Sequence, residues 1–271
     1  MMPTNPFRCQ SEPTDSFRVP TRPGDFPGLI CFWDFAHRTT DGHWPVADGT
    51  PYALREQAGA MSHVDDAGAP FHGRALGIEE GQWLAINRAD CPRLDMHGPT
   101  AHFTLVAWIR RGQTRSAHCE FIAGQWNETH KSRQYGLFLN ISVWGEHDQI
   151  CGHLSTTGGP TPGYRYCMDG PVGATPIDRD AWHCIALSYD GHHGYAWLDG
   201  RLDARPGLNP YLLPGGLHNG GATGSDFTVA AVDRSGTIGN FYRGLLGGLA
   251  IYQRVLNPAE MWALGTPAKP N

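Results

Sequence analysis

The sequence predicts an all-β protein, an antiparallel β-sandwich of the jelly-roll kind, and three observations support this fold class. Glycine (35) and proline (21) are abundant, and because both residues favour turns, many short strands are expected rather than long helices. Nine tryptophans and nine tyrosines add residues that suit strands. Apolar runs are short and end at turn signals, and hairpin signals such as "YDGHHGYAW" (189–197) separate several of them.

Eleven segments are predicted strands, because each is a short apolar or alternating run bounded by turn residues. They are 28–35, 71–78, 82–86, 102–111, 120–127, 134–144, 149–155, 182–191, 195–202, 227–232 and 241–253. Two antiparallel sheets made from them should bury Trp108, Leu137, Leu187 and Ile251 between them.

The segment "LNPAEMWALG" (256–265) predicts a short C-terminal helix. Asn257 can cap it, Pro258 suits the first helical position and Glu260 falls in the first turn. Residues 1–25 are rich in proline and lack periodicity, so they predict an N-terminal arm. No linker divides residues 26–271, which predicts a single domain there.

The net charge limits which partners are expected, and the cysteines indicate a cellular location. The net charge is −5 and no basic run stands out, which argues against nucleic acid. No stretch has the length of a membrane span and the N-terminus lacks the apolar core of a signal peptide, so no membrane partner is expected. The cysteines are odd in number, form no CxxC pair and mostly lie in apolar runs, which predicts buried reduced thiols and a cytoplasmic location. They are Cys9, Cys31, Cys91, Cys119, Cys151, Cys167 and Cys184.

Several segments in succession carry a resemblance to a known family. "FTLVAWIRR", "FIAGQWN", "QYGLFLN", "WHCIALSYDG…YAWLDGRL" and "GLLGGLAIYQRVLNPAEM" resemble the laminin-G-like group of concanavalin A-like lectins and glucanases over residues 28–264. The resemblance implies a two-sheet jelly roll whose concave sheet faces a ligand. The chain departs from the family where members often carry an Asp-Glu pair, because Gly247 and Gly248 stand there. The family includes lectins, adhesion modules, hydrolases and lyases, so it does not name an activity.

The stretch "GQWNETHKSRQYGLFL" (124–139) is unusually polar for neighbouring strands. Strand alternation predicts that one face of three consecutive strands is apolar and that the other carries amides, a histidine and an aromatic ring. Such a face suits a sugar, whose hydroxyls need fixed donors and acceptors and whose C–H faces stack on rings. A solvated sheet face is the alternative interpretation. The predicted ligand-binding residues are Gln125, Asn127, Gln134, Phe138, Asn140, His153 and Ser155.

The next segment, "GHLSTTGGPTPGYRY" (152–166), is a long loop rich in glycine and proline. It could fold over the sheet and bring Tyr164 or Tyr166 to the rim of the polar face. An ordinary long turn explains the same composition.

The same face could carry out chemistry on an acidic sugar. β-Elimination needs a base, an acid and a donor that neutralises the uronate carboxylate. His153, Tyr164 and Arg133 are the candidates for these roles. Hydrolysis by paired carboxylates is disfavoured, because Glu120 and Glu128 are expected on the opposite face.

No cofactor is required by any motif, but a structural calcium ion is one candidate. Related jelly rolls often bind calcium near the first strand, where this chain has Asp34 and Asp41. Three functions therefore stay open: a glycan-binding jelly roll, an intracellular lyase acting on an acidic sugar, and a protein-interaction module.

Overall fold

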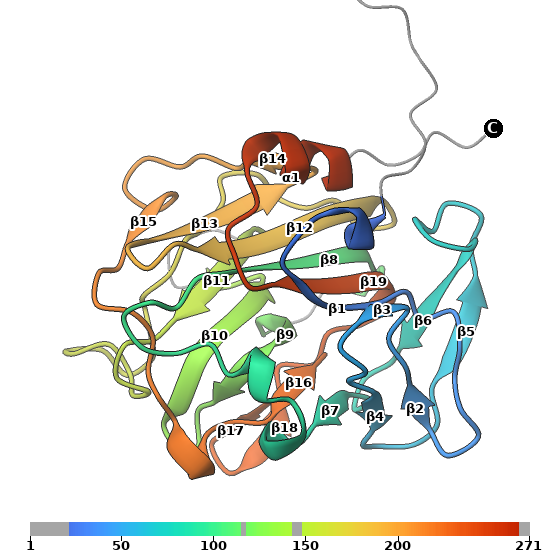
Figure 1. Ribbon diagram of the computed structural model, residues 1–271, viewed down its shortest axis with the longest axis horizontal. Coiled ribbons are helices and arrows are strands. Elements are labelled where there is room, and N and C mark those ends of the chain that lie inside the picture. Colours follow the sequence, from blue (N-terminus) through green and yellow to red (C-terminus); the bar gives the residue numbers. More distant parts are fainter. Residues whose placement is uncertain (1–21, 115–117, 143–147, 266–271) are drawn as a thin grey trace, which may run out of the picture.

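The computed structural model describes residues 22–114, 118–142 and 148–265, and it contains two antiparallel sheets packed face to face (Figure 1). The first sheet, sheet A, has the strand order β14-β13-β12-β8-β19-β1-β3, and β5, β6 and β15 join it at its sides. Its strands are β1 (Leu29–Trp33), β3 (Asp48–Gly49), β5 (Ser62–Asp65), β6 (Arg74–Ile78), β8 (Phe103–Arg111), β12 (Trp182–Tyr189), β13 (His193–Leu198), β14 (Arg201–Leu202), β15 (Tyr211–Leu212) and β19 (Gly244–Tyr252).

The second sheet, sheet B, has the order β11-β10-β9-β16-β7-β4-β2, with β17 beside β9 and β18 paired to β17. Its strands are β2 (His43–Trp44), β4 (Leu54–Glu56), β7 (Leu84–Ile86), β9 (Glu120–Asn127), β10 (Ser132–Leu139), β11 (Ile150–Leu154), β16 (Phe227–Val229), β17 (Val232–Arg234) and β18 (Thr237–Gly239). The short helices are η1 (Pro23–Asp25), η2 (Arg88–Asp90), η3 (Pro92–Leu94), η5 (Gly221–Thr223) and the α-helix α1 (Pro258–Gly265). The predicted fold class, an antiparallel sandwich with a short C-terminal helix, is confirmed.

The main hydrophobic core fills the space between the two sheets. Leu137 of sheet B and Leu187 and Ile251 of sheet A are completely buried in it, as the alternation predicts. Trp33 of β1 stacks on Phe227 of β16 with ring centroids 6.0 Å apart, which joins the two sheets directly. Burying one such large apolar side chain stabilises the fold by about 1.5–3 kcal/mol.

Trp108 corrects one prediction about the core. Its side chain does not lie between the sheets but in a second cluster on the outer face of sheet A, with Met261 and Leu264 of α1. Its indole Nε1 donates a hydrogen bond of 3.1 Å to the carbonyl of Leu264. An outward-facing aromatic residue on β8 is buried because the C-terminal helix covers it.

Helix α1 begins as the sequence predicts. The Asn257 side-chain oxygen accepts hydrogen bonds from the backbone N–H groups of Ala259 (2.9 Å) and Glu260 (3.0 Å). Glu260 reciprocates by accepting the backbone N–H of Asn257 at 2.8 Å, which completes a capping box. Glu260 also pairs with Arg254 at 2.7 Å, and this pair fixes the end of β19 to the helix.

Gly247 and Gly248 allow close packing on the same outer face. A Cβ atom added to Gly247 would lie 2.7 Å from Pro70, and one added to Gly248 would lie 2.7 Å from the ring of Phe71. The pairing of β19 with β8 also shifts register between Leu246 and Gly248. An acidic pair at these positions would therefore clash with the segment that connects β5 and β6.

The structure describes a short part of the predicted N-terminal arm and six of the seven cysteines. Residues 1–21 of the predicted N-terminal arm lie outside the described residues, while Pro23 of η1 accepts a hydrogen bond of 2.8 Å from Tyr252 Oη. The six described cysteines are unpaired, and Cys9 lies outside the described residues. Burial raises the pKa of Cys119 and Cys167 to about 11, so these thiols are protonated at neutral pH.

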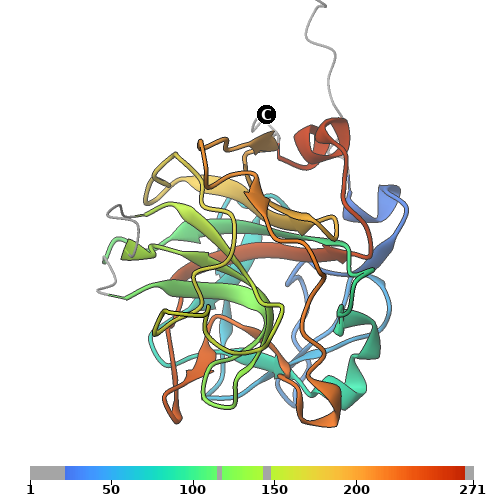
Figure 2. The ribbon, with the colours of Figure 1, turned by 90° about the vertical axis from the view of Figure 1, so that its left-hand side faces the viewer.

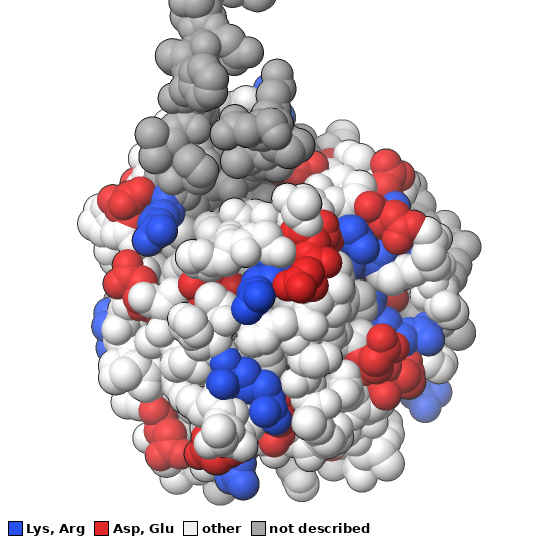
Figure 3. Space-filling model, turned by 90° about the vertical axis from the view of Figure 1, so that its right-hand side faces the viewer, with Lys and Arg blue, Asp and Glu red and all other residues white. Residues whose placement is uncertain are grey.

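The surface around β5 and β6 carries both signs of charge. Figure 3 shows acidic and basic side chains interspersed over the side of the molecule that lies to the right in Figure 1. Arg74 pairs there with Asp65 at 3.4 Å, and Arg110 pairs with Asp66 at 2.7 Å. Among the helices of the described ranges, none is both long and apolar enough to cross a membrane.

Candidate functional site

The predicted polar face of sheet B does not exist as one face, because the register of the pairing between β9 and β10 shifts twice, at Gln134 and at Ile122. Trp126 pairs with Arg133, but Gln125 pairs with Tyr135, so the register shifts at Gln134. Tyr135 lies in the main core, which places its neighbour Gln125 on the inner side of the sheet. Gln125 and Gln134 are both completely buried. The prediction that these amides share a face with His153 is therefore corrected.

A third hydrophobic cluster, which we call the covered face, occupies the outer side of β9, β10 and β11. Phe138 and His153 point into it as the alternation predicts, but neither is open to solvent, since 1% and 6% of their surfaces are exposed. The His153 ring lies 5.4 Å from that of Trp126 and 5.0 Å from that of Phe138. The cluster consists of Phe121, Trp126, Phe138, Cys151, Cys167, Val172 and Val232.

Residues that follow β11 cover this face. Figure 2 shows the segment after β11, in olive, looping beside strands β10 and β11 at the front of the molecule. Cys167 and Val172 of this segment belong to the covered face. Burial lowers the pKa of His153 to about 4, so its imidazole is neutral at pH 7.

Arg133 and Ser155 hold the start of this segment. The Arg133 guanidinium lies 5.9 Å from the Trp126 ring centroid, and its Nη1 donates to the carbonyl of Gly158 at 3.3 Å. The Ser155 hydroxyl accepts the backbone N–H of Gly158 at 2.9 Å. Asn140 is 6% exposed and donates through Nδ2 to the carbonyl of His118 at 3.0 Å. The predicted ligand-binding residues Ser155 and Asn140 and the predicted catalytic residue Arg133 thus form contacts within the protein itself.

Contacts of the turn between β9 and β10 account for two more of the polar residues in the stretch 124–139. Asn127 donates through Nδ2 to Asp233 of β17 at 3.1 Å. The Thr129 hydroxyl donates to the other oxygen of Asp233 at 2.5 Å, and it accepts the N–H of Gly236 at 2.9 Å. These contacts fasten the turn to the β17–β18 hairpin.

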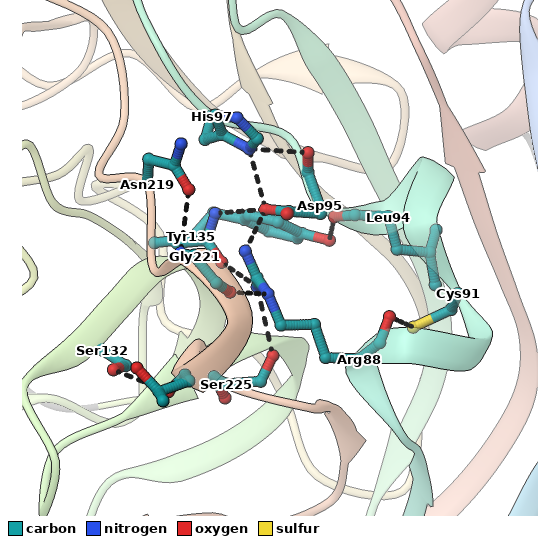
Figure 4. Close-up of polar contacts among 12 residues, drawn as sticks. Arg88, Cys91, Leu94, Asp95, His97, Ser132, Tyr135, Asn219, Gly221 and Ser225 are labelled. Atoms are coloured by element: carbon teal, nitrogen blue, oxygen red, sulfur yellow. Dashed lines mark hydrogen bonds and ion pairs between the residues drawn. The ribbon is translucent and has the colours of Figure 1, made fainter.

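Gln134 belongs to a polar cluster around Arg88, which we call the arginine clamp (Figure 4). Arg88 pairs with Asp95 at 2.5 Å and donates to the Gln134 side-chain oxygen at 2.7 Å. Gln134 Nε2 donates in turn to Asp95 at 2.9 Å, which closes a ring of three side chains. Arg88 also donates through Nε to the carbonyl of Gly221 at 2.9 Å, so the clamp ties η2, β10 and η5 together.

Two histidines lie at the outer edge of the arginine clamp. His97 contacts the Asp95 carboxylate through Nδ1 at 2.9 Å. Gly98 and Leu217 form an isolated antiparallel β-bridge, which places their chain neighbours His97 and His218 close to one another. Burial, with smaller effects from Arg88 and His97, lowers the pKa of His218. Sequence reasoning did not identify this cluster, because its residues come from separate loops.

The segment Thr161–Tyr166, which we call the tyrosine turn, is the most exposed aromatic feature. Pro162 and Gly163 occupy its centre, Gly163 has a φ of 86°, and the N–H of Tyr164 donates to the carbonyl of Thr161 at 2.9 Å. Proline followed by a residue with positive φ is the arrangement of a type II turn. A second backbone bond joins Thr161 N–H to the carbonyl of Tyr166 at 3.2 Å. The turn is therefore closed by its own backbone.

The tyrosine turn carries two aromatic rings and one cation on the surface. Tyr164 is 59% exposed and Tyr166 is 40% exposed, and these are two of the four exposed large apolar side chains among the described residues. The Arg165 guanidinium lies 5.3 Å from the centroid of the Tyr166 ring. Tyr164 was predicted to reach the rim of a sugar site, and its exposure is compatible with that role. Arg165 was missed, although the tripeptide Tyr-Arg-Tyr after Pro-Gly is visible in the sequence.

The predicted catalytic residues are not brought together in an open site. His153 and Arg133 are 6% and 5% exposed beneath the segment that follows β11, whereas Tyr164 stands on the surface. A neutral, buried imidazole cannot reach a substrate proton while that segment is in place.

Asp34 and Asp41 do not fit a calcium ion. Asp34 accepts the N–H of Ala36 at 2.9 Å and contacts His72 Nε2 at 3.0 Å, so both its oxygens are used. Asp41 pairs with a different histidine, His43, at 3.1 Å. Calcium needs six or more oxygen ligands, and the described part of the chain contains no group of three or more His, Cys, Asp or Glu residues placed to hold a metal.

Solved structures with the same architecture are numerous and distant in sequence. Domain 4 of AbnA, a GH43 extracellular arabinanase from Geobacillus stearothermophilus in complex with arabinotriose, is 14% identical, covers 88% of this chain and 98% of its own, and has a TM-score of 0.58. The binding domain of Paraclostridial Mosquitocidal Protein 1 is 13% identical, with 90% and 52% covered and a TM-score of 0.59. A mutant of Trypanosoma rangeli sialidase displaying trans-sialidase activity is 16% identical, with 88% and 32% covered and a TM-score of 0.57. At these identities the likeness shows the fold alone.

The sequence comparisons give the family. No curated protein sequence matches the chain closely enough to count as a relative. The family model described as the concanavalin A-like lectin/glucanases superfamily matches residues 84–261, which is more than half of the chain. The match runs from β7 into α1 and so includes the arginine clamp, the covered face and the tyrosine turn. The chain belongs to the concanavalin A-like lectin/glucanase superfamily.

Proposed function

We propose that the chain is a carbohydrate-binding protein and that the tyrosine turn makes the principal contact with the sugar. The observation that carries this proposal is the exposure of Tyr164 and Tyr166 on a closed turn. The two exposed rings on one short turn offer an aromatic surface, and sugars present C–H faces that stack on such rings. The family and the arabinotriose complex of the arabinanase domain support a carbohydrate as the ligand.

The turn is held in place by hydrogen bonds to the half-buried Asp169. Asp169 accepts the Thr161 hydroxyl at 2.6 Å through one oxygen and the Tyr211 hydroxyl at 3.0 Å through the other. The Thr161 hydroxyl also accepts the backbone N–H of Met168 at 2.8 Å. A surface fixed before binding loses little conformational entropy when the ligand arrives, which favours affinity.

Binding by the covered face stays a prediction, and the geometry favours the tyrosine turn over it. Phe138 and His153 are 1% and 6% exposed, so a sugar could touch them only after the segment following β11 moved away. The same burial argues against the lyase, because His153 would have to be exposed before it could act as a base.

A glycan array probed with labelled protein tests the proposal. We expect the protein to bind a subset of glycans, and we expect Tyr164→Ala and Tyr166→Ala to weaken binding to that subset. Leu212→Ala is the matched control, because Leu212 is 63% exposed and lies outside the turn. Unsaturated uronates are the products expected of a lyase. Their ultraviolet absorbance, recorded in parallel while the protein is incubated with acidic glycans, should stay at baseline. An array without bound glycans would favour the protein-interaction module, and a rise in absorbance would favour the lyase.

A further inference from the structure

We infer that the preferred glycan is anionic and that Arg165 pairs with its carboxylate or sulfate group. The inference rests on the proposed function, because it assigns a class of sugar to the tyrosine turn. It starts from the position of Arg165 between Tyr164 and Tyr166, which places one guanidinium and two phenol rings on the same exposed turn.

Arg165 has no acidic partner in the part of the chain that the structure describes. Its guanidinium makes a cation–π contact with Tyr166, 5.3 Å from the ring centroid, which holds the charge beside the ring. Asp169 is the nearest acid in sequence, but its two oxygens already accept hydrogen bonds from Thr161 and Tyr211. The positive charge of Arg165 is therefore available to a ligand.

Arg165 differs from three half-buried arginines that form ion pairs. Arg74 and Arg110 pair with Asp65 and Asp66, and Arg38 pairs with Glu56 at 2.6 Å. Arg55 and Arg201 are also exposed and form no ion pair among the described residues, but of these three arginines Arg165 alone lies between two exposed tyrosines. Its planar fork fits a carboxylate or a sulfate group, and the flanking rings fit the sugar to which that group is attached.

The charge balance also limits the kind of anionic glycan. A long polyanion would be repelled by the net negative charge of the protein at low ionic strength. A short oligosaccharide with one or two acidic groups would gain the contact with Arg165 at a smaller cost. The inference therefore names short acidic oligosaccharides, with uronate and sulfate as the two sources of the charge.

Calorimetric titration of the full chain tests this inference with three matched probes: an oligogalacturonide, its methyl ester and a sulfated neutral oligosaccharide of the same length. We expect the methyl ester to bind about fivefold more weakly than the acid, which corresponds to about 1 kcal/mol for an exposed charge pair. Binding of the sulfated probe, but not of the uronate, would identify sulfate as the source of the charge and support the inference.

Arg165→Gln should remove the preference for the acidic probe and leave affinity for the methyl ester unchanged. Arg55→Gln is the control, because Arg55 is also exposed but lies on β4. Equal affinity for the acid and its ester in the unmodified protein, or an unchanged preference in Arg165→Gln, would overturn the inference while leaving carbohydrate binding intact. Absence of binding to all three probes and to neutral glycans would instead overturn the proposed function.

Discussion

Tyr211 of β15 donates a hydrogen bond of 3.0 Å to the carboxylate of Asp169, and this bond fastens the tyrosine turn to the edge of sheet A. The contact joins two segments more than forty residues apart in sequence. Because the other oxygen of Asp169 accepts the Thr161 hydroxyl, a single side chain positions the turn from two directions.

Asp169→Asn should therefore loosen the turn and weaken glycan binding without unfolding the protein. Burial, followed by the hydrogen bond and charge of Asp169, raises the pKa of Tyr211 to about 12. Removing the charge should lower that pKa toward its ordinary value of about 10. An ultraviolet pH titration measures this shift, with Tyr211→Phe to identify the signal. An unchanged titration curve in Asp169→Asn would mean that the carboxylate does not hold Tyr211.

His153 should make the protein sensitive to mild acid. Burial lowers its pKa to about 4 in the folded state, against about 6.5 in the unfolded chain. The unfolded state therefore binds a proton first as the pH falls, so stability that is present above pH 6.5 is lost between about pH 6.5 and 4. The loss from this one group is on the order of 3 kcal/mol.

Urea denaturation at pH 7 and pH 4.5 tests this linkage by comparing the native protein with His153→Gln. The variant should lose less stability between the two pH values than the native protein does. His218→Gln serves as the comparison, because His218 is only partly buried and its pKa is lowered less by its surroundings. An identical pH dependence in His153→Gln and the native protein would contradict the assignment.

Gln125 is a candidate for a stabilising substitution. Both polar atoms of its side chain are buried without a hydrogen-bond partner among the described residues. An unsatisfied buried polar group costs about 1–3 kcal/mol, so Gln125→Leu should raise the free energy of unfolding by an amount in that range.

Gln134→Leu is the matched control for this substitution, since it sits in the same strand pair but breaks bonds to Arg88 and Asp95. It should destabilise the protein, because it leaves buried charged groups with fewer partners. Urea denaturation distinguishes the two variants. Destabilisation by both would show that Gln125 makes a contact that the structure does not reveal.

Gly248→Asp, which restores one acid of the usual family pair, should destabilise this chain. The new Cβ would lie 2.7 Å from the Phe71 ring, so the segment between β5 and β6 would have to move. Overpacking of this kind costs about 1–3 kcal/mol. Thermal unfolding measures the effect, and Gly159→Asp is the control, because a Cβ there would lie 3.7 Å from its nearest neighbour and Gly159, like Gly248, has no positive φ. Equal melting temperatures for Gly248→Asp and the native protein would contradict the packing argument.

The fold could be predicted from the sequence because its signals are local. Alternation along β8, β12 and β19 and the capping residues of α1 are each contained in about ten residues. The position of Trp108 could not be predicted, because alternation gives two faces and does not say which of them a later helix covers.

The site could be predicted only in part, for two physical reasons. Two register shifts, at Ile122 of β9 and at Gln134 of β10, changed the sides of the sheet to which the residues of these strands point, and bulges leave no clear pattern in one sequence. Several polar residues that the sequence predicts to be open to a ligand instead form hydrogen bonds with residues that are distant in the sequence. Gln134 accepts a hydrogen bond from Arg88, and Asn127 donates one to Asp233. Tyr164 was identified because a turn rich in proline and glycine displays its side chains whatever the strand register.

The most direct test of the account is the affinity of the Tyr164→Ala/Tyr166→Ala double variant for a glycan that the native protein binds. Isothermal titration should show a loss of affinity of about five- to 150-fold, since two ring contacts of about 0.5–1.5 kcal/mol each are removed. Circular dichroism and the melting temperature should stay unchanged, because both side chains are exposed. Native affinity in the double variant, with Leu212→Ala equally unaffected, would contradict the claim that the tyrosine turn binds carbohydrate.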